Sequence, residues 1–99
     1  TYSTFYLINS ICKNIDKGSY LNIGFWNGFS LFSGMLNTQC DVVGVDNFSE
    51  FNGNSSEHQF KKKFNKIKKD NHHYFNLDAL EYLKTCNKKF DFSLKLDIS

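Results

Sequence analysis

The chain has 99 residues and a formal net charge of +2, so its length admits one domain and excludes a second. So small a positive charge predicts neither a nucleic-acid nor a membrane partner, because both classes require a strongly basic patch. No apolar run approaches the roughly 20 residues that span a bilayer, and the N-terminus lacks the features of a signal peptide. We therefore expect a cytoplasmic protein.

The three cysteines, Cys12, Cys40 and Cys86, are widely spaced and form no C-x-x-C pair. Neither a disulfide framework nor a zinc site is expected from this spacing, and the thiols are interpreted as core or near-core residues.

An amphipathic helix is predicted over about residues 3–15. Apolar residues recur there at helical spacing, with Asn and Lys between them: Phe5, Ile8, Ile11, Cys12 and Ile15. We expect this helix to cover one face of a sheet. Gly18 is expected to end it in the left-handed conformation.

A short apolar strand from about Tyr20 is followed by a turn that carries Gly24 and Gly28. Glycines permit unusual backbone torsions and let a ligand approach the main chain. A helix with an apolar stripe follows, expected to be capped by Ser30, and its free N–H groups suit a carboxylate or a phosphate. The spacing is G-x-x-x-G rather than G-x-G-x-x-G, which argues against NAD and FAD. The stripe is Leu31, Phe32, Met35 and Leu36.

The next strand is predicted at Val42–Val45, where continuous hydrophobicity is typical of a buried parallel strand. It ends in Asp46, the position at which nucleotide-binding α/β folds hold a ribose through an acidic side chain. These two strand ends together predict a nucleoside site.

Two motifs carry a resemblance to a known family. The Gly24–Gly28 turn with Ser30, and the segment Val43-Gly44-Val45-Asp46-Asn47-Phe48-Ser49-Glu50-Phe51, resemble the first two motifs of class I S-adenosylmethionine-dependent methyltransferases of the macrocin O-methyltransferase-like branch. The resemblance implies that the glycine loop holds the methionine end of the cofactor and that Asp46 binds the ribose hydroxyls. It implies a cofactor site of Asn22, Gly24, Trp26, Gly28, Ser30, Asp46, Asn47, Phe48 and Asp78.

The resemblance further implies that Phe48 and Asp78 frame the adenine. Such methyltransferases usually carry an acid where this chain has Asn22, and an amide accepts a hydrogen bond without bringing a charge to an ammonium group. Asp78 is also expected to cap the helix that follows it, and the two roles are compatible.

Between these motifs, a loop over 47–56 leads into a helix that Ser55 or Ser56 is expected to cap. Phe60, Phe64 and Ile67 form its apolar stripe, and its many lysines are interpreted as a solvated face, with a phosphate-binding face as the alternative.

A third strand is predicted from His72 to about residue 79. His72 and His73 alternate across it, so they cannot ligate one metal together, and both are expected at the surface or at a strand edge.

A fourth strand is predicted over Phe90–Asp97. The resemblance implies that Asp97, at its carboxyl end, lies beside the transferred methyl group as a catalytic residue and binds a divalent metal such as Mg. Ile98 and Ser99 stand where the family has a glycine and a second acid.

The elements together predict an α/β fold: a Rossmann-like, doubly wound parallel sheet in the partial order 3-2-1-4, with helices on both faces. Residues 1–99 are interpreted as one cofactor-binding domain, the N-terminal part of a larger methyltransferase domain. The expected function is S-adenosylmethionine binding for O-methyl transfer to a sugar or another hydroxylated metabolite. The alternative is a non-catalytic, degenerate module that binds a nucleoside or a protein. The open edge of the fourth strand predicts a homodimer.

Overall fold

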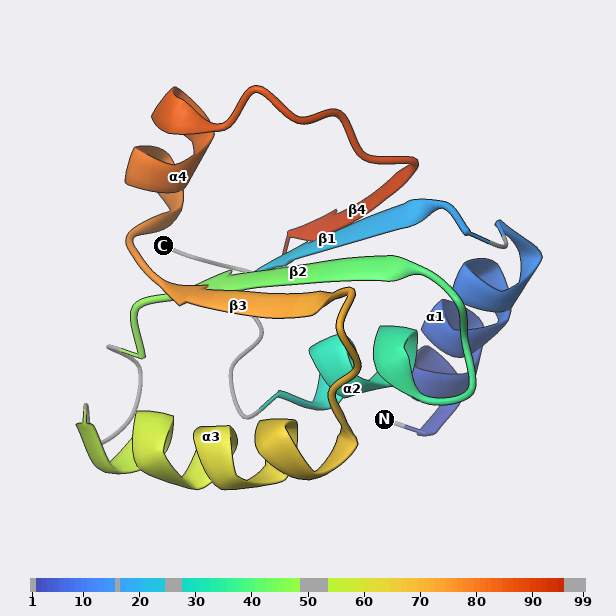
Figure 1. The fold of residues 1–99 in the computed structure, drawn as a ribbon, viewed down its shortest axis with the longest axis horizontal. Helices are drawn as coiled ribbons and strands as arrows, with labels where there is room; N and C mark the ends of the chain where they lie inside the picture. The colour runs from blue at the N-terminus through green and yellow to red at the C-terminus, as the bar shows by residue number, and fades with distance from the viewer. Residues whose placement is uncertain (1, 16, 25–27, 49–53, 96–99) are drawn as a thin grey trace.

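The fold is a four-stranded parallel sheet with helices on both faces (Figure 1). This computed structural model describes residues 2–15, 17–24, 28–48 and 54–95. The strand order is β3-β2-β1-β4, which confirms the predicted Rossmann-like class and order. The elements are α1 (Tyr2–Asn14), β1 (Ser19–Ile23), α2 (Phe29–Met35), β2 (Asp41–Asp46), α3 (Asn54–Ile67), β3 (His72–Asn76), α4 (Ala79–Thr85) and β4 (Phe92–Lys95).

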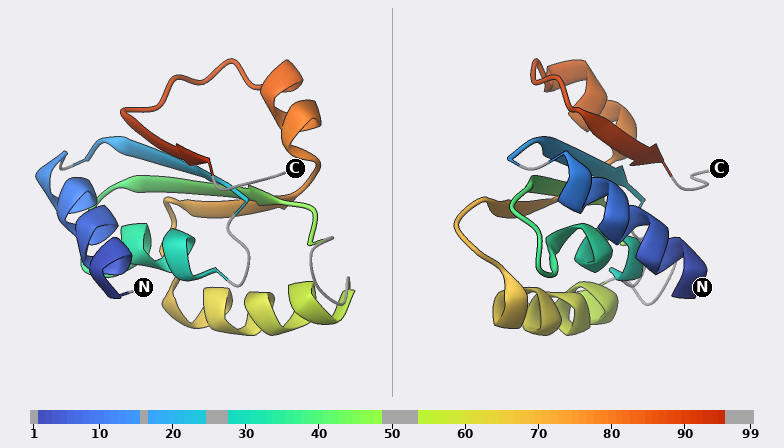
Figure 2. Two further views of the ribbon diagram at one scale, coloured as in Figure 1. Left: turned by 180° about the vertical axis from the view of Figure 1, so that it is seen from behind. Right: turned by 90° about the vertical axis from the view of Figure 1, so that its right-hand side faces the viewer.

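Three helices, α1, α2 and α3, cover one face of the sheet, and α4 lies on the other (Figures 1 and 2). Side chains alternate across a strand, so Tyr20 of β1 belongs to the larger core under the three helices, while Leu21 and Ile23 belong to a smaller core under α4. The larger core contains Ile8, Cys12, Tyr20, Leu31, Met35, Cys40, Val42, Phe48, Phe60 and Phe64.

The first helix is fastened to α2 by one side chain. The Asn9 side-chain amide donates to the carbonyl oxygens of Ser33 (2.9 Å) and Leu36 (2.8 Å), which lie at the end of α2, where a helix leaves carbonyls without an intrahelical partner. The thiol of Cys40 donates to the carbonyl oxygen of Cys12 (3.0 Å). The predicted docking of this helix against the core of the sheet is confirmed.

The turn after α1 differs from the prediction. Lys17 has the positive φ of 62°, whereas Gly18 does not belong to the positive-φ residues. Gly18 is needed for space, because an added Cβ would lie 2.9 Å from both the Ile15 carbonyl oxygen and the Asp91 carboxylate. That carboxylate accepts a hydrogen bond from the Ser19 backbone N–H (2.9 Å). Gly18 therefore allows the start of β1 to meet the turn before β4.

Three predicted boundaries were wrong. The helix α3 begins at Asn54, so Ser55 and Ser56 lie inside it rather than at its cap. The strand β3 ends at Asn76, and β4 begins only at Phe92. Asp78 ends the third strand early because it caps α4 through its side chain.

The two histidines of β3 point to opposite faces, as predicted. His73 is exposed, whereas His72 is only 3% exposed and begins the edge strand β3. For His72 the expected surface position is therefore wrong and the alternative, a strand-edge position, is correct. The Lys69 backbone N–H donates to His72 Nδ1 (3.0 Å). The turn that leaves α3 thus folds over this side chain. Within the described ranges, no helix is both long and apolar enough to cross a membrane.

Candidate functional site

At the carboxyl ends of β1, β2 and β3, Gly24, Asp46 and Asn76 lie side by side. The Gly24 N–H donates to the Val45 carbonyl oxygen (2.8 Å), which sets the start of the glycine loop beside the last residue of β2, Asp46. Asp46 in turn lies opposite Asn76 in the parallel register. Ligands of open α/β sheets bind at the carboxyl ends of the strands, which we call the carboxyl edge of the sheet.

The glycine loop has the backbone geometry that glycine permits. Gly24 has a φ of 74° and Gly28 a φ of 95°, values that side-chain-bearing residues adopt with difficulty. At Gly28 an added Cβ would also lie 2.7 Å from the Phe32 ring and 2.8 Å from the Phe60 ring. Core packing under the loop therefore requires this glycine independently of any ligand. Trp26 lies outside the described residues.

Asn22 and Ser30 are both buried and lie against each other. Asn22 is fully buried, and Ser30 Oγ donates to Asn22 Oδ1 (2.9 Å). The Ser30 carbonyl oxygen accepts from the Tyr20 hydroxyl (3.0 Å) and from Ser33 Oγ (2.6 Å). The predicted capping of α2 by Ser30 is therefore wrong, because Gly28 occupies the N-cap position. Its side chain instead ties β1 to the first turn of α2.

Asp46 is held by the loop that it begins. Its Oδ1 accepts from the Phe48 backbone N–H (2.9 Å), and Phe48 has a φ of 58°. The Phe48 ring is 3% exposed and packs 5.6 Å from the Phe60 ring and 6.2 Å from the Tyr74 ring, centroid to centroid. Phe48 thus anchors the loop in the core and orients the Asp46 carboxylate. Asn47 between them is exposed.

Asp78 caps α4, as predicted. Its side chain is exposed and accepts from the Leu80 backbone N–H (3.0 Å). It follows the end of β3 by two residues, at the same edge of the sheet as Asp46. Its predicted contact with adenine, like that of Phe48, stays a prediction.

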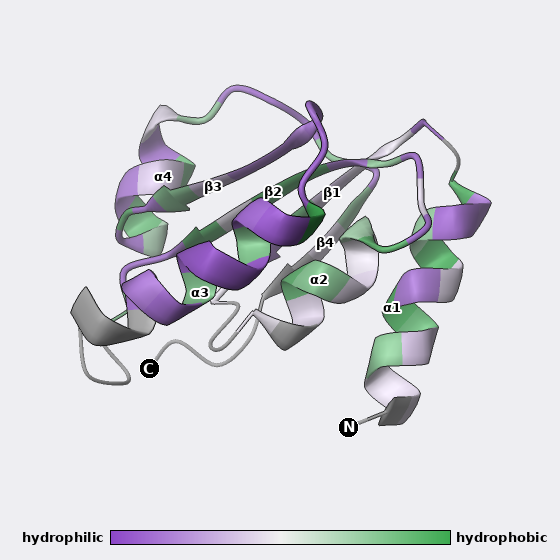
Figure 3. Cartoon of the chain, turned by 60° about the horizontal axis from the view of Figure 1, so that its bottom comes forward, coloured by the Kyte–Doolittle hydropathy of each residue, from purple (hydrophilic) through white to green (hydrophobic). Residues whose placement is uncertain are grey.

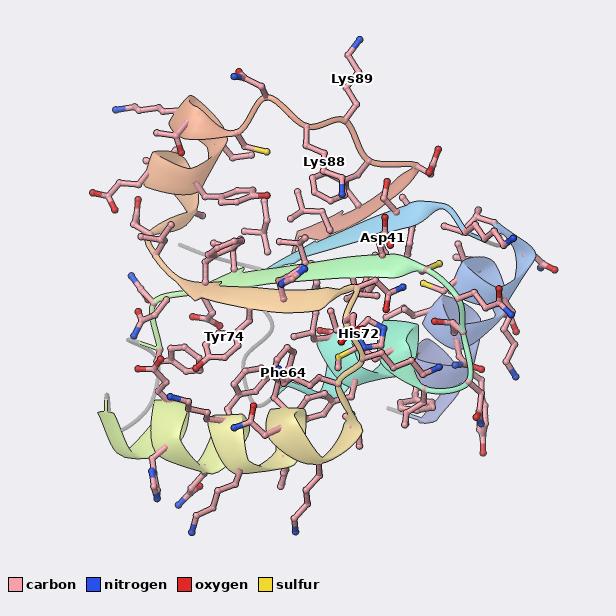
Figure 4. All side chains as sticks on the ribbon, in the orientation of Figure 1. Asp41, Phe64, His72, Tyr74, Lys88 and Lys89 are labelled. Atoms are coloured by element: carbon pink, nitrogen blue, oxygen red, sulfur yellow. The ribbon has the colours of Figure 1, made fainter. Side chains whose placement is uncertain are left out.

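Glu57 and Asn76 belong to the same edge and were missed by the sequence reasoning. The Glu57 carboxylate accepts from the Asn76 side-chain amide (2.8 Å) and from the Tyr74 hydroxyl (3.1 Å). Figure 4 shows Tyr74 and Phe64 between β3 and α3. Burial, followed by the neighbouring Glu57, raises the pKa of Tyr74. In the sequence, the signal for this position was a polar residue, Asn76, near the end of the predicted third strand. Its register opposite Asp46 comes from the structure.

The predicted catalytic and metal-binding residue, Asp97, lies outside the described residues. In the part of the chain that the structure describes, no group of three or more His, Cys, Asp or Glu side chains is arranged to hold a metal ion.

No protein-family model matches the sequence, and the search of curated proteins finds no match either. Solved structures do match. Coclaurine N-methyltransferase bound to N-methylheliamine and SAH is 16% identical with a TM-score of 0.63, and the match covers 94% of this chain and 27% of that one. The Trypanosoma brucei PRMT1 enzyme–prozyme complex with AdoHcy is 18% identical with a TM-score of 0.63, covering 89% and 26%.

PKMT2 from Rickettsia typhi in complex with AdoHcy is 20% identical with a TM-score of 0.61, and the match covers 96% of this chain and 19% of that one. The chain therefore spans about a quarter or less of the proteins that it resembles. At these identities the likeness concerns the fold. The chain has the class I S-adenosylmethionine-dependent methyltransferase fold, with the strand order 3-2-1-4.

Proposed function

We propose that this chain binds S-adenosylmethionine at the carboxyl edge of its sheet, as the cofactor-binding part of a larger O-methyltransferase domain. The observation that carries the proposal is the hydrogen bond from the Gly24 N–H to the Val45 carbonyl oxygen. It sets Gly24, which has a positive φ, directly beside the strand-end acid Asp46. The three matched structures, which share this fold, contain SAH or AdoHcy.

In this proposal each part of the edge has one task. The backbone of the glycine loop holds the methionine end of the cofactor, with Trp26 and Ser30 beside it, and the Asp46 carboxylate accepts hydrogen bonds from the two ribose hydroxyls, next to Asn47. Asp78 and the loop at Phe48 border the adenine. The carboxylate is already oriented by the Phe48 N–H, so little ordering is left for the ligand to impose.

The acceptor that we propose is a hydroxyl of a sugar or another small metabolite, as in the macrocin O-methyltransferase-like branch. Bound S-adenosylmethionine would supply the methyl group: the acceptor oxygen would bond to the methyl carbon while the carbon–sulfur bond breaks, and the electron pair of that bond would stay on sulfur, giving neutral S-adenosylhomocysteine. A base takes the hydroxyl proton, and correct placement supplies most of the acceleration. Asp97, with a divalent metal such as Mg, remains our proposal for this role.

Calorimetric titration with S-adenosylhomocysteine tests the proposal. Asp46→Ala should weaken binding by about 1.5–3 kcal/mol, the contribution of hydrogen bonds to a charged group, and should leave the affinity for methionine nearly unchanged. Asp41→Ala is the matched control, since Asp41 is an exposed acid at the opposite end of the same strand. Equal losses in the two variants, or tighter binding of NAD than of S-adenosylhomocysteine, would contradict the proposed site.

The second candidate is a non-catalytic module that binds a nucleoside weakly or only a protein. One observation favours it: Asn22, where methyltransferases usually carry an acid, is fully buried and accepts from Ser30. A neutral group in that environment offers no charge to the cofactor's ammonium. This candidate predicts no binding of S-adenosylhomocysteine at millimolar concentration, and the same titration separates the two.

A further inference from the structure

A groove runs along the outer side of α2, between α1 and α3. Figure 3 shows α2 between these two helices on one side of the molecule. The second helix has 7 residues, and it is bordered by the longer helices α1, with 13 residues, and α3, with 14 residues. The groove has a volume of about 280 Å³ and is lined by Phe5, Phe32, Leu36, Lys63, Lys66 and Ile67.

The floor of the groove is apolar. Leu36, which was predicted to pack onto the sheet, is 37% exposed here, because the helix ends at Met35 and the chain turns away at this residue. Phe5, Phe32 and Ile67 are half-buried and supply the remaining apolar surface. These four side chains give the groove an apolar lining, and two lysine side chains border it.

Positive charge lies along one rim only. Lys63 and Lys66, three residues apart on α3, are exposed, and the ammonium group of neither forms a hydrogen bond or ion pair with another residue that the structure describes. On the opposite rim α1 contributes Phe5, which carries no charge. Salt screens exposed charges only beyond about 10 Å at 0.1 M, so an occupant seated in the groove would lie within reach of both lysines.

The size of the groove favours side-chain anchors over a complete small-molecule ligand. Its volume of about 280 Å³ is slightly below the ~300–1,000 Å³ of typical ligand pockets and roughly twice the ~150 Å³ cavity that holds benzene. Two apolar side chains would fill it. Such anchors, four residues apart on one helix face, are the usual means by which a helix occupies a groove.

We propose that this groove docks an acidic amphipathic helix of a partner protein. Two apolar side chains of that helix would fill the space over Phe32, Leu36 and Ile67, and its acidic residues would face Lys63 and Lys66 on α3. The one-sided charge sets the orientation of the partner in the groove. This surface is formed by α1, α2 and α3, and it shares no lining residue with the proposed cofactor edge.

A fluorescence anisotropy titration tests the proposal with a synthetic helical peptide, which carries two leucines four positions apart and glutamates on the adjoining face. We expect micromolar binding by the full chain that weakens with added salt. Replacing the two leucines of the peptide with alanine should weaken binding by at least about fivefold. Failure of the parent peptide to bind at millimolar concentration would overturn the proposal.

Two pairs of variants locate the binding on the chain. Leu36→Lys should weaken it by at least about fivefold, whereas Leu80→Lys, on an exposed leucine of α4, should not. The double variant Lys63→Glu/Lys66→Glu should abolish it, whereas Lys61→Glu/Lys62→Glu changes the charge of α3 equally at two exposed lysines that do not line the groove. Circular dichroism checks that each variant is folded. If Leu36→Lys is unfolded, the comparison of the two double lysine variants tests the location of the site.

Equal losses in the two lysine pairs would show attraction by overall charge and would overturn the docking site. Anionic vesicles and a short DNA duplex are titrated in parallel. If either binds more tightly than the peptide and is unaffected by Leu36→Lys, the lysines serve a charged surface rather than a protein helix, and the proposal is likewise overturned.

Discussion

The hydroxyl of Ser30 donates a hydrogen bond to the side-chain carbonyl of Asn22 across 2.9 Å, and both side chains are buried. Asn22 is a residue of the central strand β1, and Ser30 belongs to the first turn of α2. The strand end and the helix start are therefore joined by a hydrogen bond between two buried polar side chains. Gly24 follows this strand and Gly28 precedes this helix, so the two glycines of the predicted loop adjoin the two tied ends.

Ser30→Ala should destabilise the chain by about 1–3 kcal/mol, because it removes the donor from a buried carbonyl oxygen. Chemical denaturation followed by circular dichroism measures the change. Ser10→Ala, at an exposed position of α1, is the control and should shift the free energy of unfolding by no more than about 0.5 kcal/mol. Equal stability of Ser30→Ala and the parent would mean that this hydrogen bond contributes nothing in solution.

Gly28→Ala should destabilise the chain by at least about 2 kcal/mol, because it combines a strained positive φ with overpacking. The new methyl group would press on the rings of Phe32 and Phe60. Any loss of ligand binding in this variant must therefore be corrected for the fraction unfolded. Chemical denaturation followed by circular dichroism measures both the loss of stability and the fraction unfolded.

The double variant Gly28→Ala/Phe32→Leu distinguishes the two causes. If the ring contact contributes, the double variant should lose less stability than the sum of the single variants, since neighbouring residues are not additive. Strict additivity would assign the whole cost to the backbone torsion.

Acid should destabilise the chain through His72. Burial, aided by the positive charges of Lys69 and His73 and opposed by Asp41, lowers the pKa of His72 from 6.5 to about 4. The unfolded chain therefore binds more protons than the folded chain between these values, so stability falls as the pH drops from 6.5 to about 4, by at most about 3 kcal/mol.

The geometry around His72 explains this direction. Its Nδ1 accepts from the Lys69 N–H, so Nε2 carries the proton of the neutral ring, and Nε2 has no hydrogen-bond partner in the described part of the chain. Protonation would break the Nδ1 bond. Denaturation at a series of pH values should show a much smaller slope for His72→Gln, whereas His73→Gln should reduce the slope only slightly, because the charge of His73 contributes less to the lowered pKa of His72 than burial does. Parallel slopes for the parent and both variants would contradict this assignment.

The chain should associate through β4. Among the described strands β4 has one neighbour, β1, so its outer edge presents unpaired backbone groups that invite another strand. Light scattering over a concentration series should detect dimers or larger species. Leu94→Lys should reduce them, whereas Leu83→Lys, on an exposed leucine of α4, should not. A monodisperse monomer at every concentration would show that the edge does not pair.

The class of the fold and its strand order followed from the sequence alone. Continuous apolar runs at Val42–Val45 and apolar spacing at Phe60, Phe64 and Ile67 report which residues avoid water, and these patterns distinguish buried parallel strands from amphipathic helices. Asp78 as a cap and Asp46 at a strand end were also correctly placed, because both depend on local position along the chain.

Only the tertiary structure decided which side chains meet. The sequence patterns do not reveal that Phe60 packs against Gly28 or that Ser30 bonds to Asn22. Nor do they reveal that the turn at Lys69 closes over His72. Each of these contacts joins separate elements, and its geometry depends on how the helices settle on the sheet. Periodicity in a sequence records burial, whereas the identity of the partner is a property of the packed molecule.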